Sequence, residues 1–82
     1  MKYRIEIDKP ALKFLQRQPQ AQRERLLRAI QGLPDIGDVK PLGGHENLYR
    51  LRVGLFRVLY TVAGELLIVR VLSIGNRGDV YK

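Results

Sequence analysis

The chain has 82 residues, of which 15 are lysine or arginine and 8 are aspartate or glutamate, giving a formal net charge of +7 at pH 7. A chain this short forms one domain, residues 1–82, with one modest core. The lack of cysteine excludes disulfides and thiolate sites, and a single histidine excludes a two-histidine acid–base pair. We therefore expect a basic domain without a cofactor or metal, whose partner is a polyanion.

The first half of the chain predicts a strand followed by two helices. Alternation of apolar and polar side chains over residues 2–7 is typical of a half-buried strand, and this N-terminus lacks a signal-peptide core. Asp8 is a favourable N-cap for a helix with Pro10 in its first turn. A second helix is expected from about Pro19 to Leu33, so the two helices form a hairpin.

The second half predicts a loop and then a meander. Residues 35–46 contain Gly37, Pro41, Gly43 and Gly44 and are expected to form a loop. The period then switches to two, which predicts strands at residues 48–53, 55–62 and 65–74, with turns at Gly54-Leu55 and Ala63-Gly64. The expected fold class is α+β: an N-terminal strand, a helical hairpin and a three-stranded antiparallel meander form one twisted sheet, which the helices cover on one face.

The arginines of the meander are predicted to share one face. Residues directly opposite in an antiparallel pair lie on the same side of the sheet. The turn at Gly54-Leu55 therefore places on the helix-covered side Tyr49, Leu51, Val53, Phe56, Val58 and Tyr60. Arg50, Arg52 and Arg57 fall on the other side, and a two-residue turn at Ala63-Gly64 adds Arg70.

The C-terminal segment is predicted to reach this group of arginines. The last strand returns beside Arg57, so Arg77 and Tyr81 can approach its rim. Such arginines either extend into solvent or hold an anion between them. The arginine group followed by an Arg-x-x-x-Tyr tail favours a phosphate site.

Three segments carry a family resemblance: NLYRLRVG at residues 47–54, FRVLY at 56–60 and IGNRGDVY at 74–81. In this order and spacing, together with the DKPA opening at residues 8–11, the chain resembles the RelE/ParE superfamily of bacterial and archaeal type II toxins. The resemblance spans nearly the whole chain. It implies either a RelE-type messenger-RNA interferase acting in the ribosomal A site or a ParE-type poison of DNA gyrase without nuclease residues.

The matched positions favour the RelE type. By resemblance, Arg77 and Tyr81 occupy the nuclease motif, Arg57 matches the arginine of the third strand, and Arg50 and Arg52 match two basic positions of the second strand. These last two are often lysine in RelE toxins. Arginine binds phosphate but is a poor proton donor or acceptor.

The implied chemistry is metal-independent RNA cleavage by attack of the 2′-hydroxyl. Arg57 and Arg77 suit stabilisation of the phosphorane charge. Arg50 and Arg52 suit RNA binding, to which Arg70, not a motif position of the family, is auxiliary. Tyr81 could stack on a base, or act as general base if the arginines lower its pKa below the usual value of about 10.

Other polar groups compete with this site. The adjacent His45 and Glu46 resemble the pair of a secreted ribonuclease, but neighbouring side chains in an extended segment diverge. Tyr49 and Tyr60 are expected in the core rather than as base-stacking platforms. A solvated helix face, or contacts with ribosomal RNA or an acidic antitoxin, would account for Arg23, Arg25 and Arg28.

Three functions follow as expectations. The first is a cytoplasmic, ribosome-dependent endoribonuclease that binds mRNA and ribosomal RNA and is silenced by a small acidic antitoxin, with no membrane contact. The second is a ParE-like gyrase inhibitor. The third is a non-catalytic RNA- or ribosome-binding module.

Overall fold

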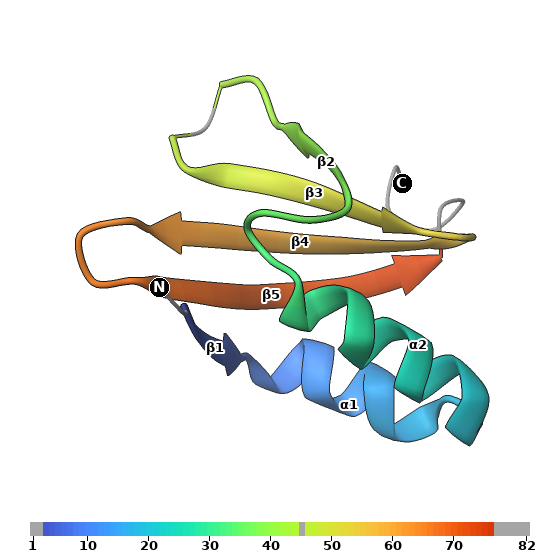
Figure 1. The fold of residues 1–82 in the computed structure, drawn as a ribbon. Helices are drawn as coiled ribbons and strands as arrows, with labels where there is room; N and C mark the ends of the chain where they lie inside the picture. The colour runs from blue at the N-terminus through green and yellow to red at the C-terminus, as the bar shows by residue number, and fades with distance from the viewer. Residues whose placement is uncertain (1–2, 45, 77–82) are drawn as a thin grey trace.

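The computed structural model describes residues 3–44 and 46–76, which form two helices against one face of a five-stranded sheet (Figure 1). The elements are β1 (Arg4–Ile7), α1 (Lys9–Arg17), α2 (Gln20–Gln31), β2 (Asp38–Pro41), β3 (Leu48–Val53), β4 (Phe56–Ala63) and β5 (Ile68–Asn76). The strand order is β1-β5-β4-β3-β2. β1 runs parallel to β5 and the other neighbours are antiparallel. The predicted α+β class is confirmed.

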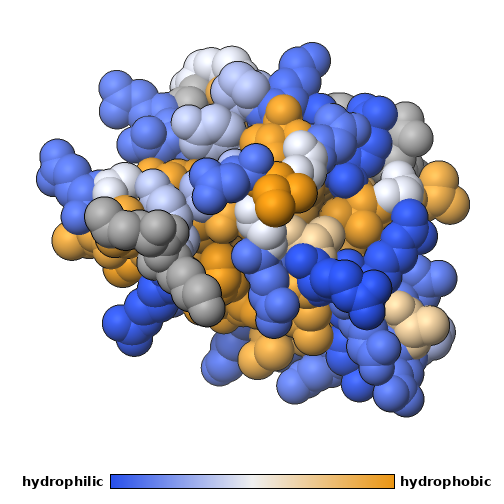
Figure 2. All heavy atoms as spheres, viewed as in Figure 1, coloured by the Kyte–Doolittle hydropathy of each residue, from blue (hydrophilic) through white to orange (hydrophobic). Residues whose placement is uncertain are grey.

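Both helices begin near the predicted residues. Asp8 occupies the N-cap position of α1 and Pro10 lies in its first turn, but the Asp8 side chain makes no capping hydrogen bond. Pro19 precedes α2, which ends at Gln31, two residues earlier than predicted. Hydrophilic side chains gather over α2 (Figure 2), as expected for the outward side of a helix on a core. Neither described helix is long and apolar enough to cross a membrane.

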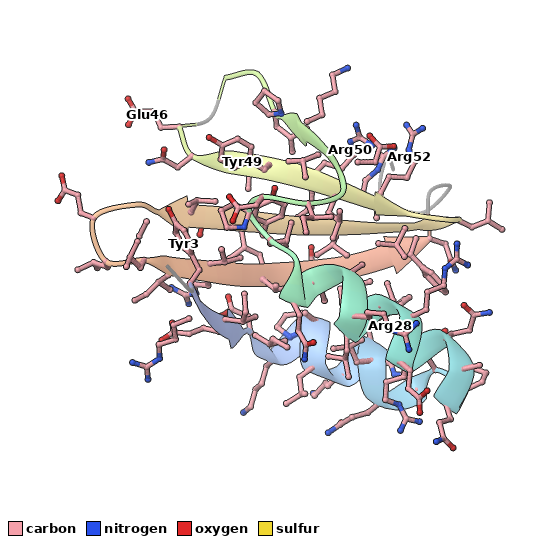
Figure 3. All side chains as sticks on the ribbon, in the orientation of Figure 1. Tyr3, Arg28, Glu46, Tyr49, Arg50 and Arg52 are labelled. Carbon is pink, nitrogen blue, oxygen red and sulfur yellow. The ribbon has the colours of Figure 1, made fainter. Side chains whose placement is uncertain are left out.

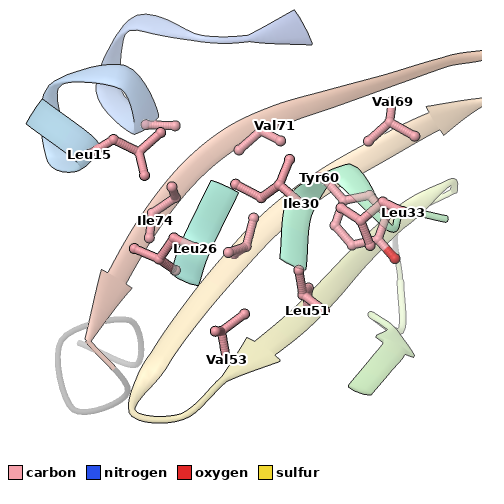
Figure 4. Packing of buried hydrophobic residues seen from close by; sticks show 12 residues of the cluster. Leu15, Leu26, Ile30, Leu33, Leu51, Val53, Tyr60, Val69, Val71 and Ile74 are labelled. Carbon is pink, nitrogen blue, oxygen red and sulfur yellow. The ribbon is translucent and has the colours of Figure 1, made fainter. Parts of the chain in front are cut away.

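The core lies between the helices and the inner face of the sheet. Leu26 and Ile30 of α2 project toward the strands (Figure 4) and are fully buried. The core consists of Ala11, Leu15, Leu26, Ile30, Leu33, Leu51, Val53, Val58, Tyr60, Val69, Val71 and Ile74. It includes four of the six residues predicted for the helix-covered side, and the other two, Tyr49 and Phe56, pack against it.

The β3–β4 hairpin has the predicted register. Val53 pairs with Phe56 and Arg52 with Arg57, so Gly54 and Leu55 form a two-residue turn. Gly54 has φ +59°, the positive value that a type II′ turn requires at its first central position. A Cβ there would lie 2.9 Å from Arg25 Nη2 of α2, so this glycine also admits the helix side chain.

The predicted turn between β4 and β5 is wrong. Ala63 pairs with Ile68, and residues 64–67 form the turn, in which Leu67 has φ +55°. The run Leu66-Leu67-Ile68 has the composition of a strand, but Leu66 is 70% exposed at the tip. A register shift between Leu59 and Tyr60 further displaces β5 along β4. The longer turn changes the partner of every paired residue of β5, and the register shift changes the partners again from Ser73 to Asn76.

The segment predicted as a loop contains an edge strand. β2 pairs with β3 over four residues, with Asp38 opposite Arg52 and Lys40 opposite Arg50. Pro41 ends this strand at the sheet edge, where a missing N–H is tolerated. β2 therefore widens by one strand the sheet face opposite the helices.

Candidate nucleic-acid interface

Three arginines meet on the side of the sheet away from the helices, and we call this group, Arg50, Arg52 and Arg57, the arginine face. Arg52 and Arg57 are direct cross-strand partners, and Arg50 is two residues from Arg52 on β3. Figure 3 shows Arg50 and Arg52 at the same end of β3, beside β2. Like charges directly opposite each other destabilise a sheet. The predicted grouping of these three residues is confirmed by the strand register.

The three arginines differ in burial. Arg50 is 6% and Arg57 4% exposed to solvent, whereas the side chain of Arg52 is 40% exposed. Arg50 Nη1 is fully buried and has no hydrogen-bond partner. A buried guanidinium nitrogen without an acceptor carries an unrecovered desolvation free energy. An anionic oxygen at this position would supply the missing acceptor.

One carboxylate lies beside the arginine face. Asp38 Oδ2 is 3.9 Å from Arg52 Nε, and both side chains are largely exposed. Exposed ion pairs at this separation contribute little, typically about 0–1 kcal/mol. Asp38 therefore contributes little to stability, and within the described residues its printed partner on this face is Arg52.

Arg70 does not join the arginine face. It pairs with Thr61 of β4, not Arg57, and with Glu6 of β1. Thr61 is four residues from Arg57, roughly 13 Å along the strand. Arg70 Nε instead donates a hydrogen bond to Asp8 Oδ1 at 2.8 Å. This hydrogen bond, together with the negative charge of Asp8, raises the pKa of Arg70. Arg70 still lies on the same side of the sheet as Arg57, as predicted, because Thr61 and Arg57 are an even number of residues apart on β4. The longer β4–β5 turn changes its cross-strand partner and its position along the strand.

The C-terminal end of β5 reaches the arginine face, as predicted. Gly75 pairs with Arg57 and Asn76 with Phe56. Gly75 therefore places no side chain beside Arg57. Arg77 and Tyr81 follow in the sequence but lie outside the described residues, as does His45.

The tyrosines of the meander belong to the core. Tyr49 and Tyr60 stack with ring centroids 5.6 Å apart and an interplanar angle of 20°. Tyr60 is fully buried, and its hydroxyl has no hydrogen-bond partner. Burial, with a smaller effect of Tyr49, raises the pKa of Tyr60 to about 12. The prediction that both rings lie on the helix-facing side of the sheet is confirmed, with Tyr60 in the core and Tyr49 packed against it.

The arginines of α2 have separate environments. Arg23 Nη2 donates to the Gln18 carbonyl oxygen at 2.9 Å, which ties α2 to the preceding turn. Arg25 lies over Gly54. Arg28 projects from α2, away from Arg50 and Arg52 (Figure 3). Only Arg25 and Arg28 are exposed, so the predicted solvated helix face is smaller than expected.

Lys40 lies next to the arginine face although the sequence pattern did not predict it there. It lies directly opposite Arg50 and is exposed. Alternation over Asp38-Val39-Lys40 was the available signal, but three residues beside a proline give a weak strand pattern. Within residues 3–44 and 46–76, no group of three or more His, Cys, Asp or Glu side chains could hold a metal ion.

Comparison with known proteins adds family information. Residues 5–81 match a family described as "ParE toxin of type II toxin-antitoxin system, parDE". The toxin candidate RelE1 of Methanocaldococcus jannaschii is 33% identical over 88 residues, covering 100% of this chain and 98% of that protein.

Solved structures share the fold. A chain in the crystal structure of the archaeal RelE-RelB complex from Pyrococcus horikoshii OT3 has a TM-score of 0.77 and 34% identity, covering 96% of this chain and 99% of that one. The isolated Escherichia coli RelE toxin has a TM-score of 0.73 and 29% identity, covering 96% and 90%.

Proposed function

Because this chain belongs to the RelE/ParE superfamily of type II toxin–antitoxin toxins, we propose that it is a ribosome-dependent, metal-independent endoribonuclease that cleaves mRNA in the ribosomal A site. The observation that carries the proposal is the arginine face. Two arginines are direct cross-strand partners, and a third has a buried nitrogen without an acceptor. A phosphodiester carries the negative charge that attracts these cations and supplies the acceptor oxygen that Arg50 Nη1 lacks.

Each residue has a proposed role in attack by the 2′-hydroxyl. Arg50 and Arg52 bind RNA phosphates and fix the backbone across β3. Arg57, adjacent to Arg52 and bordered by Gly75, stabilises charge on the scissile phosphate together with Arg77. Tyr81 accepts the 2′-hydroxyl proton or stacks on a base. Arg70, held by Asp8, contacts RNA only beyond this centre.

A neighbouring antitoxin follows from the same family membership. Relatives are solved as RelE-RelB complexes, and we expect an equivalent partner here, small and acidic because it must neutralise a chain of net charge +7. Toxin, antitoxin, mRNA and ribosome would meet in the cytoplasm. The curated and structural relatives carry the RelE name, which favours RNA cleavage over gyrase inhibition.

The test compares single arginine variants in a translating extract. We expect Arg57→Ala to reduce mRNA cleavage by about 100- to 1000-fold, the usual effect of removing one transition-state donor. Arg77→Ala and Tyr81→Ala should also lose cleavage. Arg4→Ala is the matched control, because Arg4 is an exposed arginine of the opposite edge strand β1, where it forms an ion pair with Glu6.

Cleavage is mapped by primer extension with and without ribosomes. Full cleavage by Arg57→Ala, Arg77→Ala and Tyr81→Ala would refute the assigned residues. Intact mRNA with altered plasmid supercoiling would instead identify a gyrase inhibitor. Salt-sensitive RNA binding without cleavage by the wild-type protein would leave only a binding module.

A further inference from the structure

We propose that Lys40 is an additional RNA-binding residue that extends the arginine face onto the edge strand β2 and holds a phosphate flanking the scissile one. The inference deepens the proposed function and rests on it. It comes from the register of β2, which brings a residue from the predicted loop into line with Arg50.

The sheet arranges the charges in two adjacent rows. One row contains Asp38, Arg52 and Arg57, and the next contains Lys40 and Arg50. Residues directly opposite in antiparallel strands have Cα atoms about 4.5–5.5 Å apart and side chains on one face. A phosphate over Arg50 therefore has Lys40 as its neighbour on the side of β2.

The two rows differ in charge balance. Arg52 has Asp38 at 3.9 Å. Lys40 forms no ion pair with any residue in the described part of the chain, and Arg50 Nη1 has no acceptor. Among the residues that the structure describes, the Lys40–Arg50 row thus carries two positive charges and no facing carboxylate. Such an arrangement destabilises the isolated sheet, and a bound anion would reverse the effect.

The two cations suit different contacts. Arg50 is buried and its planar fork fixes the geometry of a phosphate, whereas Lys40 is exposed and its ammonium is a point charge that accepts varied geometries. β2 is the edge strand. RNA crossing from β4 over β3 would leave the sheet at Lys40, which assigns this residue to the flanking backbone rather than to the reacting phosphate.

The matched pair of variants is Lys40→Gln and Lys13→Gln. Lys13 is an exposed lysine of α1, on the helix-covered side of the sheet, so both changes remove one exposed positive charge. Affinity is measured by fluorescence anisotropy with a short 2′-O-methyl RNA, which lacks the attacking hydroxyl, over a range of salt concentrations. The full-length chain is used throughout.

Loss of one phosphate contact on single-stranded RNA should reduce the slope of log K against log salt by about 0.7, which corresponds to about fivefold weaker binding at 0.1 M salt. We expect this smaller slope for Lys40→Gln. Lys40→Arg and Lys13→Gln should both keep the slope of the wild type. Thermal unfolding of Lys40→Gln should match or exceed that of the wild type, because no stabilising contact is lost.

Equal slopes for Lys40→Gln and Lys13→Gln would overturn the inference, even if the wild-type protein cleaves mRNA. Reduced stability of Lys40→Gln with an unchanged slope would overturn it in favour of a structural role. A slope change specific to Lys40→Gln would support it, and if the extract then showed no cleavage, the nuclease proposal alone would fail.

Discussion

Replacement of Arg50 by methionine is expected to stabilise the protein while weakening RNA binding. Arg50 is 6% exposed, lies opposite Lys40 and has a buried nitrogen without a hydrogen-bond partner. Methionine retains an unbranched, flexible apolar stem but carries neither the charge nor the unpaired donor. The change thus separates the packing of Arg50 from its electrostatics.

The magnitude follows from the unpaired donor. A buried polar group without a partner destabilises by about 1–3 kcal/mol, and removal of the like charge beside Lys40 acts in the same direction. Arg50 is 6% exposed, so the shorter methionine leaves part of the space of the guanidinium group unfilled, and this offsets part of the gain. We expect a net increase of about 1 kcal/mol in the free energy of unfolding, or about 4–8 °C in Tm for a domain of this size.

The assay is urea denaturation and thermal unfolding, with Arg52→Met as the control. The Arg52 side chain is 40% exposed and its ion pair with Asp38 is long, at 3.9 Å, so its replacement should change the free energy of unfolding by less than about 0.5 kcal/mol. RNA affinity should fall in both variants. A lower Tm for Arg50→Met than for Arg52→Met would refute the reasoning, because it would mean that the Arg50 guanidinium is satisfied in the free protein.

Two further predictions concern the core and the β3–β4 turn. The pKa of Tyr60 is about 12 in the folded protein and about 10 in the unfolded chain, so the folded state holds the phenolic proton more tightly. The contribution of Tyr60 to the free energy of unfolding is therefore fully present below pH 10 and is lost as the pH rises toward 12. Between pH 9 and 11 the wild type should lose about 1 kcal/mol of unfolding free energy that Tyr60→Phe retains, as measured by urea denaturation; equal losses would contradict the assignment. Gly54→Ala should lower the free energy of unfolding by about 1–2 kcal/mol because of its positive φ, whereas Gly43→Ala, with nothing within 4 Å of its added Cβ, should have little effect; similar urea midpoints for both would contradict the strain argument.

The candidate site was partly predictable because side-chain parity along a strand is local. A two-residue period and the Gly54 turn were enough to place Arg50, Arg52 and Arg57 on one face. Their burial was not predictable, since parity assigns a side but says nothing of how deeply a side chain packs. The cross-strand partner of Arg70 was also not predicted, because it depends on the length of the β4–β5 turn.

The sequence by itself determined the α+β class, the order of the elements from β3 onward and the sharing of one face by three arginines, because these depend on local period and turn chemistry. Tertiary structure decided which strands lie at the edges, the pairing of Arg70 with Asp8 and the position of Lys40 beside Arg50. These features depend on pairing between segments that are far apart in the chain. The four residues of β2, for example, have little strand pattern of their own and form a strand because they are hydrogen-bonded to β3. The +7 charge indicated a polyanion, and only the register of the sheet showed which cations face it together.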